Sequence, residues 1–265
     1  MTKLTFRTAL ITGASAGLGA EYARQLAAAG TDLVLVARRL DRLEALAAEL
    51  RGTHGVRVEP LQADLSTTDG IGRVERRIAG DETIDLLVND AGFGGRKGFI
   101  KGETADHLTM IRVHVEATVR LTKAALAGMI ERGRGAVINV SSIAAFSVFS
   151  GAMYSGTKAF LVMFSENLQD QVRPKGIVVQ ALCPGMTHTE FHQVAAIDNS
   201  IVPRPFWMTA PEVVRISLRR LGHGVVCVPG WKNKVIAFFM RCPATAVIVR
   251  LVGRTMAVRA RTEEN

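Results

Sequence analysis

Short apolar runs alternate with helical stretches along most of this chain, and this alternation limits the folds open to it. Residues 9–11 and 33–36 are continuously apolar, and the stretch between them has a helical pattern that Gly30 ends. Segments that alternate in this way form βαβ units with a parallel sheet. Because the strands are apolar throughout, helices should cover both faces of the sheet. We therefore predict an α/β, doubly wound Rossmann fold with a single parallel sheet of about seven strands.

The same criteria place the other elements. The predicted strands lie at residues 9–11, 33–36, 56–58, 84–88, 136–140, 177–182 and 225–228. The predicted helices lie at residues 17–29, 41–50, 67–78, 104–132, 153–172 and 211–221. Asp41 is the expected N-cap of the second helix, and Thr209 with Glu212 forms a capping box at the last. Ligands of such sheets bind beyond the carboxyl ends of the strands, so the turns there should hold the function.

We predict that residues 1–230 form one domain, because all the alternating strands and helices lie within this range. Residues 231–265 form a basic, amphipathic extension, which Pro243 divides into two helices. The three cysteines lie far apart, which favours a reducing compartment and predicts neither disulfides nor a metal site. The N-terminal residues lack the apolar segment of a secretory signal, and the apolar runs are too short for a membrane span. These features predict a cytoplasmic protein.

The formal net charge of +9 limits the partners. It is compatible with an anionic cofactor, an anionic membrane surface or nucleic acid. The basic residues are scattered, and aromatic residues make up only 6% of the chain and do not alternate with basic ones. Single-strand binding needs such an alternation, so we predict no nucleic-acid partner. The extension at 231–265 could lie on an anionic membrane or pack on the protein.

A glycine-rich turn, TGASAGLG at residues 12–19, follows the first predicted strand. Glycines there let the backbone approach a pyrophosphate, and the next helix offers its N-terminal N–H groups to an anion. The predicted cofactor-binding residues of this turn are Gly13, Ser15, Gly17, Leu18 and Gly19. Its position directly after the first strand of a βαβ chain makes dinucleotide binding the expected function.

The ends of the second and third strands indicate which dinucleotide binds. Arg38 and Arg39 stand where an NAD-binding protein places an acidic residue, and an arginine there accommodates a 2′-phosphate. We therefore predict a preference for NADP(H) over NAD(H), with Arg38 as the first phosphate ligand and Arg39 as the second. Beyond the third strand, Asp64 could bind the adenine amino group, with Leu65 beside it.

Polar residues at the next two strand ends suggest where chemistry takes place. The turn Asn89, Ala91 and Gly92 is small enough for a ribose to pack against it. Ser141 and Ser142 end the fifth strand, where a hydroxyl could polarise a carbonyl. Tyr154 and Lys158 follow, one helical turn apart and on the same helix face. The ammonium should lower the pKa of the Tyr154 phenol and prepare it for proton transfer.

In these motifs the chain resembles the short-chain dehydrogenase/reductase family, over roughly residues 6–230. The resemblance rests on the glycine turn, Asn89 to Gly92, Ser142, Tyr154 with Lys158, and Pro184-Gly185. It is similar to the ketoacyl and hydroxysteroid reductase subgroup in the NDAGFG run at 89–94 and the VPG run at 228–230. The resemblance implies an oxidoreductase that transfers hydride from the nicotinamide, and a homodimer or homotetramer.

The same resemblance implies the roles of individual residues. Tyr154 exchanges a proton with the substrate oxygen, Lys158 holds the nicotinamide ribose and lowers the pKa of Tyr154, and Ser142 binds the carbonyl. Pro184 and Gly185 belong to the cofactor site. Thr187 and Thr189 match positions that hold the carboxamide.

Two positions depart from the family pattern. Asp90 stands where the family often has asparagine, and it could weaken cofactor binding or accept bonds from ribose hydroxyls. His114 stands where an asparagine usually completes a catalytic tetrad through a water bridge to the lysine. Its imidazole could take over the proton relay as a catalytic group with an altered pH dependence. Alternatively, it is a histidine satisfied inside the helices.

The segment at about 187–209 is the expected substrate lid, and its apolar content suggests a lipophilic substrate. The leading prediction is an NADPH-dependent reductase that converts a lipophilic 3-oxo compound, of ketoacyl or steroid-like type, to an alcohol. The rival is an NADP(H)-binding redox sensor or scaffold with little turnover. Asp90 and His114 favour the rival, while the presence of Ser142, Tyr154 and Lys158 favours the enzyme.

Overall fold

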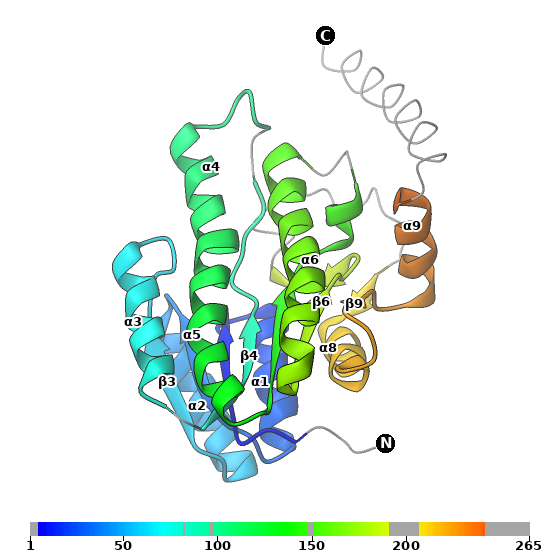
Figure 1. Ribbon diagram of the computed structural model, residues 1–265. Helices are drawn as coiled ribbons and strands as arrows, with labels where there is room; N and C mark the ends of the chain where they lie inside the picture. The colour runs from blue at the N-terminus through cyan, green and yellow to red at the C-terminus, as the bar shows by residue number, and fades with distance from the viewer. Residues whose placement is uncertain (1–4, 82, 96–97, 148–150, 191–206, 242–265) are drawn as a thin grey trace.

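The computed structural model describes residues 5–81, 83–95, 98–147, 151–190 and 207–241, and a seven-stranded parallel sheet forms its centre (Figure 1). The strands are β1 (Thr8–Thr12), β2 (Asp32–Ala37), β3 (Val58–Gln62), β4 (Ile84–Asn89), β5 (Gly135–Val140), β6 (Ile177–Leu182) and β9 (Val226–Cys227). Their order is β3-β2-β1-β4-β5-β6-β9, so the direction of the crossovers reverses between β1 and β4. This is the doubly wound Rossmann arrangement, and the predicted fold class is confirmed.

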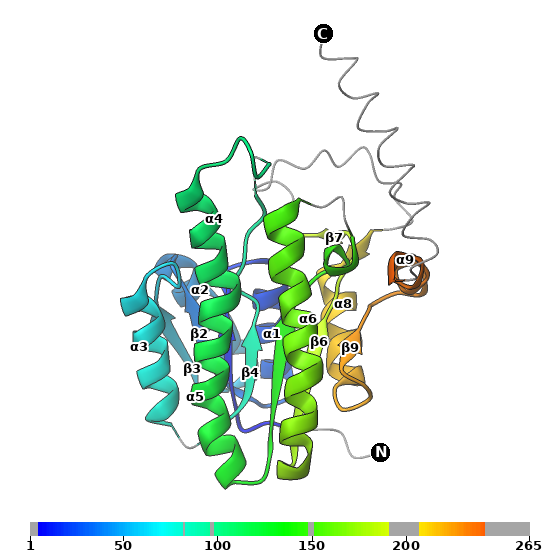
Figure 2. The same cartoon turned by 45° about the horizontal axis from the view of Figure 1, so that its top comes forward.

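Helices cover both faces of the sheet. One layer contains α1 (Gly17–Ala28), α2 (Leu40–His54) and α8 (Ala210–Arg220). The other contains α3 (Thr68–Ala79), α4 (Thr104–Ile111), α5 (Ala117–Glu131) and α6 (Ala152–Val172). Figure 2 shows α5 and α6 side by side over the central strands. Each layer encloses its own apolar cluster, as expected for strands that are apolar on both sides.

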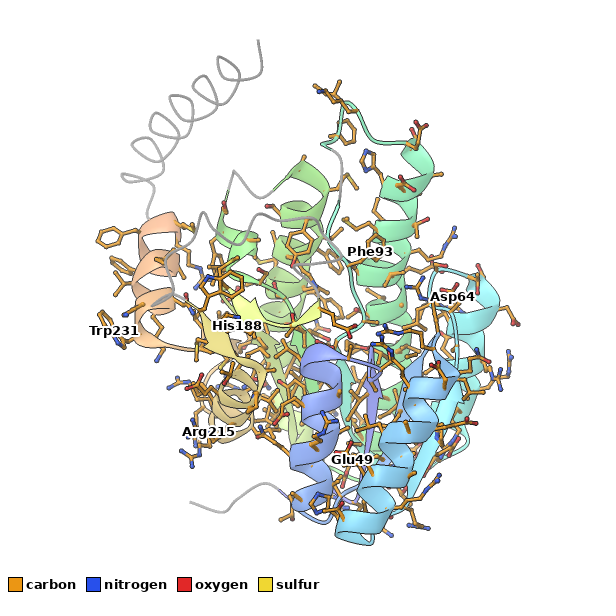
Figure 3. All side chains as sticks on the ribbon, turned by 180° about the vertical axis from the view of Figure 1, so that it is seen from behind. Glu49, Asp64, Phe93, His188, Arg215 and Trp231 are labelled. Carbon is orange, nitrogen blue, oxygen red and sulfur yellow. The ribbon has the colours of Figure 1, made fainter. Side chains whose placement is uncertain are left out.

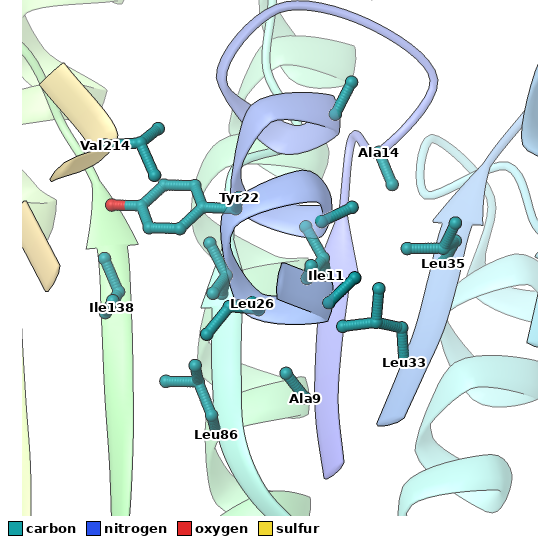
Figure 4. Close-up of a cluster of buried hydrophobic side chains, with 14 of the residues drawn as sticks. Ala9, Ile11, Ala14, Tyr22, Leu26, Leu33, Leu35, Leu86, Ile138 and Val214 are labelled. Carbon is teal, nitrogen blue, oxygen red and sulfur yellow. The ribbon is translucent and has the colours of Figure 1, made fainter. Parts of the chain in front are cut away.

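The core between α1 and α8 includes one buried tyrosine. The side chain of Tyr22 is fully buried among Ile11, Leu26 and Val214 (Figure 4). Its hydroxyl donates a hydrogen bond to Ser217 Oγ at 2.5 Å, so its polar atom is satisfied in the apolar surroundings. This pair fixes α1, which begins at the glycine turn, against α8.

Two element boundaries differ from the predicted ones. The third strand was expected at 56–58 and lies at Val58–Gln62 instead, across Pro60. A proline lacks the N–H of a sheet ladder, but β3 is an edge strand with one partner, where proline is tolerated. The N-cap of α2 is Arg39 and not Asp41, which lies in the first helical turn. The predicted capping box at the start of α8 is confirmed, with Thr209 as its N-cap.

The helix predicted at 104–132 is not continuous. A single π-helical turn, η1 (Arg112–Glu116), separates α4 from α5. Such turns insert one extra residue into an α-helix and frequently mark functional sites. His114 lies within this turn and is buried.

The ends of the predicted lid meet in a short parallel pair. β7 (Thr187–His188) pairs with β8 (Met208–Thr209), and the rings of His188 and Trp207 stack with their centroids 4.6 Å apart. Residues 191–206, which include most of the lid, lie outside the described residues. The two described ends of the predicted lid therefore lie together, beyond the end of β6.

The extension begins with α9 (Trp231–Arg241), which packs on the domain. Asn233 and Ala237 are buried, and Arg241 pairs with Glu166 of α6 at 3.7 Å. Pro243 and the predicted second helix lie outside the described residues, and the domain division at residue 230 stays a prediction. Among the described helices, none combines the length and apolar character that crossing a bilayer requires.

Candidate active site

The carboxyl ends of β1, β4, β5 and β6 meet at one edge of the sheet, and most of the predicted site residues follow them. In Figure 3, Asp64, Phe93 and His188 lie toward this edge, and Glu49 lies toward the opposite one. Short turns lead from the strands into α1 and α6 and into η2 (Ile143–Phe146). The topology therefore gathers residues that are far apart in the chain.

Ser142 and Tyr154 are bonded to each other at this edge. Ser142 is the N-cap of η2, and its Oγ accepts a hydrogen bond from the Ala144 N–H at 3.1 Å. The same hydroxyl forms a hydrogen bond with the Tyr154 phenol. Ser141 is buried, and its Oγ donates to the Lys158 carbonyl at 2.7 Å. The geometry thus brings Ser142, and not Ser141, to the phenol.

Lys158 lies one turn further along α6 and is buried. Its Nζ donates a hydrogen bond to the Val140 carbonyl at 2.8 Å and lies 5.7 Å from the centroid of the Tyr154 ring. Burial lowers the pKa of Lys158 to about 8, although the nearby Asp90 carboxylate raises it. The ammonium is held in place by the end of β5, directly behind the phenol.

The predicted lowering of the Tyr154 pKa is wrong for this geometry. Burial raises the pKa of Tyr154 to about 12; the hydrogen bond with Ser142 lowers it, and the Asp90 carboxylate raises it further. Burial is thus the largest cause of the shift, and it acts in the direction opposite to the predicted one. The phenol stays protonated at neutral pH, and this form can donate a proton to a substrate oxygen.

Asp90 is turned toward the start of α1. The Gly19 N–H donates to its carboxylate, and a Cβ on Gly19 would lie 2.8 Å from Asp90 Oδ2. Burial raises the pKa of Asp90 to about 7, opposed by the charge of Lys158 and by the bond from Gly19. The positive end of the helix dipole favours an anion at this position. Asp90 therefore binds a helix N-terminus and lies within the electrostatic reach of Lys158.

Both ring nitrogens of His114 form hydrogen bonds. Its Nε2 accepts a hydrogen bond from the Phe93 N–H at 3.0 Å, so Nδ1 holds the proton and donates to Thr157 Oγ1, also at 3.0 Å. Thr157 Oγ1 in turn donates to the Tyr154 carbonyl. Burial lowers the pKa of His114 well below its usual range, and Lys158 lowers it further. This arrangement favours the satisfied histidine over the proton relay, and it joins the turn after β4 to the start of α6.

Replacing His114 with leucine should therefore affect stability more than the pH dependence of catalysis. The variant leaves the Phe93 N–H without its acceptor, and we expect a loss of about 2–3 kcal/mol in the free energy of unfolding. Urea denaturation measures this loss. The matched control is His54→Leu on the exposed surface of α2, for which we expect a change within about 0.5 kcal/mol. A relay would instead give a kcat profile with an ionisation that disappears in His114→Leu.

The glycine turn fits a pyrophosphate. Gly13 and Gly17 have positive φ values of 71° and 58°, which glycine adopts without strain. A Cβ on Gly13 would lie 3.0 Å from the Ala91 N–H nitrogen, and one on Gly19 would lie 2.6 Å from the Gly13 oxygen. Leu18 packs against the core. The turn therefore exposes backbone N–H groups at the start of a 12-residue helix, where phosphates bind.

Thr12, which the sequence did not single out as a contact, holds the two turns together. Its Oγ1 accepts hydrogen bonds from the Asp90 and Ala91 N–H groups at 3.0 and 3.1 Å. Gly92 comes next, and a Cβ there would lie 3.1 Å from His114 Nε2 and 3.4 Å from Lys158 Nζ. The Asn89 side chain faces the protein interior, where its Nδ2 donates to Asn139 and Thr122, so only the backbone of Asn89 is left to contact a ribose. The parallel register of β4 and β5 pairs Asn89 with Asn139 and turns its amide away from the edge.

A cavity of about 380 Å³ lies beyond the ends of β2 and β3. Arg38, Asp64 and Arg73 are among its lining residues. Thr67, and not Asp64, is the N-cap of α3, so the Asp64 carboxylate is not needed as a helix cap. It accepts from the Ser66 N–H and faces the cavity, while the Leu65 side chain is buried in the core. The cavity is suited to an adenosine, with Asp64 available for the amino group.

Arg39 reaches back over the glycine turn. Its Nη2 donates to Ser15 Oγ at 3.0 Å, and its Nη1 pairs with Glu190 at 3.3 Å. Arg42 also pairs with Glu190, at 2.8 Å. Neither Arg42 nor Glu190 was predicted from the sequence, because 148 residues separate them and neither belongs to a recognisable motif. The two guanidinium groups that bind this carboxylate are donors that a phosphate also uses.

The end of β6 completes the edge. The Pro184 carbonyl accepts a hydrogen bond from the Ile143 N–H at 2.9 Å, and the Gly185 carbonyl accepts from Thr187 Oγ1 at 3.0 Å. Thr189 lies against the glycine turn, because a Cβ on Gly17 would come within 3.5 Å of its side chain. The segment with the two threonines therefore crosses from β6 toward the predicted pyrophosphate site.

A match to a known protein family accompanies this geometry. The family model described as short chain dehydrogenase matches residues 7–199. The chain belongs to the short-chain dehydrogenase/reductase family. It is an NAD(P)-dependent oxidoreductase with a Rossmann fold.

Similar proteins support the assignment of this chain to the short-chain dehydrogenase/reductase family. The chain is 35% identical to an uncharacterized oxidoreductase of Myxococcus xanthus, covering 85% of this chain and 86% of the relative. It is 30% identical to a very-long-chain 3-oxoacyl-CoA reductase of Macaca fascicularis, covering 84% and 73%. A solved short-chain dehydrogenase from Sphingobium yanoikuyae in complex with NADPH is 35% identical, with a TM-score of 0.82 and coverage of 96% and 95%. Ketoacyl reductases are thus among the relatives of this chain.

Proposed function

We propose that this protein is an NADPH-dependent reductase that converts a lipophilic 3-oxo compound, of ketoacyl or steroid-like type, to an alcohol. The observation that supports this most is the convergence of Ser142 and Lys158 on a protonated Tyr154 at the sheet edge. A protonated phenol next to a hydroxyl is suited to bind a carbonyl oxygen and to donate a proton to it. At neutral pH the phenol has the protonated form that carbonyl reduction requires.

Each residue has one part in this mechanism. The nicotinamide cofactor, when bound, would supply a hydride to the carbonyl carbon. The Ser142 hydroxyl donates to the substrate oxygen and orients it, and Tyr154 gives its phenolic proton to that oxygen as charge develops on it. The ammonium of Lys158, fixed by Val140, stabilises the phenolate that remains. The residues that would hold the cofactor are Gly13, Ser15, Gly17, Gly19, Arg38, Arg39, Asp64, Gly92, Thr187 and Thr189.

Aromatic side chains near the edge support a lipophilic substrate. Phe93 packs edge-on against His114 with ring centroids 5.4 Å apart, and Trp207 stacks on His188 at the base of the lid. The relative from Macaca fascicularis is named as a reductase of very-long-chain 3-oxoacyl-CoA. Each methylene of an acyl chain that becomes buried stabilises the bound state by about 0.8 kcal/mol. An apolar site would therefore favour long-chain substrates over small ketones.

Turnover on a panel of carbonyl compounds tests the proposal. We expect NADPH absorbance to fall with 3-oxoacyl thioesters or ketosteroids, and kcat/KM to rise up to about fourfold per added methylene of the acyl chain. A small ketone such as acetone serves as the control. Micromolar NADPH binding without turnover on any carbonyl would favour the redox sensor instead.

We also propose that NADP(H) is preferred over NAD(H). Arg38 lines the cavity suited to the adenosine, and Arg39 lies against Ser15 of the glycine turn. Replacing Arg38 with aspartate should weaken NADPH binding about 10- to 100-fold and leave NADH binding nearly unchanged, because only NADPH has the 2′-phosphate. Titration of cofactor fluorescence measures both constants. Equal NADPH affinity of the variant and the wild type would refute this assignment.

The outer face of α9 supports peripheral contact with an anionic membrane. Trp231, Val235, Phe238 and Phe239 lie 46% to 71% exposed at helical spacing, and Figure 3 shows Trp231 pointing away from the domain. Lysines beside them, at positions 232 and 234, complement an anionic surface. An apolar helix face with a basic margin is typical of helices that lie in a membrane interface. We infer that α9 packs on the domain with one face and binds lipid with the other.

Flotation with liposomes tests this contact. The wild type should float with vesicles that contain anionic phospholipid, and the double variant Trp231→Ser/Phe238→Ser should lose most of this binding. The control is Ile100→Ser, which removes an apolar side chain that is 95% exposed near α4. If wild type and double variant float equally poorly, the exposed face of α9 serves another purpose, such as contact with a second subunit.

We infer a homodimer or homotetramer as well. Ile130 of α5 and Phe160 and Met163 of α6 are apolar and 38% to 62% exposed, on helices that lie side by side. Exposed apolar residues on adjacent helices favour an interface between copies of a chain. Light scattering after gel filtration measures the assembly, and a monomer at micromolar concentration would contradict the inference.

A further inference from the structure

The carboxylate of Glu190 forms ion pairs with two arginines above the glycine turn. It lies 2.8 Å from Arg42 Nη1 and 3.3 Å from Arg39 Nη1. The same Arg39 side chain donates to Ser15 Oγ at 3.0 Å through Nη2 and at 3.3 Å through Nε. The three charged side chains are 43% to 47% exposed, so the cluster is open to solvent. Arg39 therefore links a residue of the cofactor turn to an acid from the segment that follows β6.

The position of this cluster matters because its members come from three parts of the predicted cofactor site. Ser15 belongs to the turn after β1, and Arg39 follows β2, where an arginine accommodates a 2′-phosphate. Glu190 directly follows Thr189, whose side chain lies against Gly17. An anion that bound to Arg39 and Ser15 would therefore lie close to the Glu190 carboxylate, which binds the same Arg39 guanidinium.

We propose that Glu190 is an internal anion that competes with the 2′-phosphate of NADPH for Arg39 and Arg42, and so limits the preference for NADPH over NADH. The proposal rests on the proposed NADP(H) preference. A guanidinium that binds a carboxylate offers the same fork of N–H donors to a phosphate, and a phosphate has more charge and more acceptor oxygens. The bound 2′-phosphate would have to displace the carboxylate or stay near it, and like charges in proximity repel each other.

The consequence differs for the two cofactors. NADH presents a ribose hydroxyl at this position, so it has no anion that competes with Glu190. The 2′-phosphate of NADPH must compete with Glu190 for the arginines, so the affinity for NADPH should rise when the carboxylate is removed. Because the cluster is half exposed, salt should screen the effect, and the gain should shrink at high ionic strength.

Calorimetric titration of Glu190→Gln tests the proposal. The probes are NADPH, NADH and adenosine 2′,5′-bisphosphate, each at about 20 and 300 mM salt, across the screening range. We expect the variant to bind NADPH and the bisphosphate roughly 3- to 10-fold more tightly than the wild type at low salt, and less than that at high salt. NADH binding should change less than about twofold.

The matched control is Glu49→Gln. Glu49 pairs with Arg24 at 2.8 Å, and the two side chains are 46% and 47% exposed, nearly as in the Arg39–Glu190 pair. It lies at the opposite end of the molecule from the site, as Figure 3 shows. The control should bind both cofactors like the wild type, which separates a local effect from a change in net charge.

Two results would overturn the proposal, and they differ in what they say about the cofactor preference. If Glu190→Gln binds NADPH no more tightly than the wild type while Arg39→Gln binds it more weakly, the competition is absent but the phosphate site stands. If neither variant changes NADPH binding and the wild type binds NADH equally well, the proposed NADP(H) preference fails too.

Discussion

Replacing Tyr154 with phenylalanine is expected to lower kcat by roughly 100- to 10,000-fold, the usual contribution of a general acid. The variant loses only the hydroxyl, so the ring keeps its edge-on contact with His114, at a centroid distance of 6.0 Å. NADPH binding should stay within about threefold of the wild type, because the phenol acts on the substrate oxygen. Steady-state kinetics and a fluorescence titration measure the two quantities.

The chain provides its own control for this substitution. It has only two tyrosines, and the other, Tyr22, is fully buried between α1 and α8 with its hydroxyl bonded to Ser217. Tyr22→Phe should cost about 1–2 kcal/mol of stability, since it leaves Ser217 without this donor, while kcat per folded molecule stays unchanged. Comparable losses of kcat in the two variants would mean that Tyr154 is important for folding and not for proton transfer.

Replacing Lys158 with methionine should lower kcat roughly 100- to 1,000-fold and also weaken the structure at alkaline pH. The loss of kcat follows because no cation remains to stabilise the Tyr154 phenolate. The structural effect follows from Asp90, whose pKa is raised by burial to about 7 and is lowered by the charge of Lys158. Without the ammonium, the pKa of Asp90 should rise further.

The sign of the pH effect follows from linkage. The folded protein raises the pKa of Asp90 above its unfolded value of about 3.9, so the protonated carboxyl favours folding. This stabilisation of the folded state is fully present below about pH 4 and is lost as the pH rises through about 7. In Lys158→Met the loss should continue to higher pH, and the free energy of unfolding should fall more between pH 5 and 8 than in the wild type. Urea denaturation at the two pH values measures it.

A double variant separates the two roles of Lys158. Lys158→Met/Asp90→Asn has no titrating carboxyl at this position, so its stability should lose the steep fall between pH 5 and 8 while kcat stays low. The amide oxygen that replaces the carboxylate in that variant can still accept the Gly19 N–H. If the double variant recovers kcat, Lys158 acts only by compensating the charge of Asp90.

The sequence was sufficient for the fold class and for the residues at the ends of the strands. Continuous apolar runs define buried strands, and a parallel sheet brings their carboxyl ends to one edge, so Ser142 and the Tyr154–Lys158 pair could be placed together before the structure was known. The third strand was misplaced because Pro60 argues against a strand, and only the sheet order reveals that β3 is an edge.

Other features depend on burial and on long-range contacts. Spacing along α6 brings Lys158 close to Tyr154 but does not show how desolvation acts on the phenol, and desolvation reverses the expected direction of the Tyr154 pKa shift. The π-helical turn that turns His114 toward Thr157 has no local signal in an otherwise helical pattern. Glu190 meets the arginines only because the chain after β6 crosses the glycine turn.

The most direct test of the proposed reductase is a single-turnover experiment with NADPH deuterated at C4 of the nicotinamide and a long-chain 3-oxoacyl thioester. Mass spectrometry of the product shows where the deuterium goes. We expect the wild type to form the 3-hydroxyacyl thioester with deuterium on the carbinol carbon, and Tyr154→Phe to form it at least about 100-fold more slowly. Tight binding of NADPH with no deuterium in any product of the carbonyl panel would contradict the proposal and favour a redox sensor.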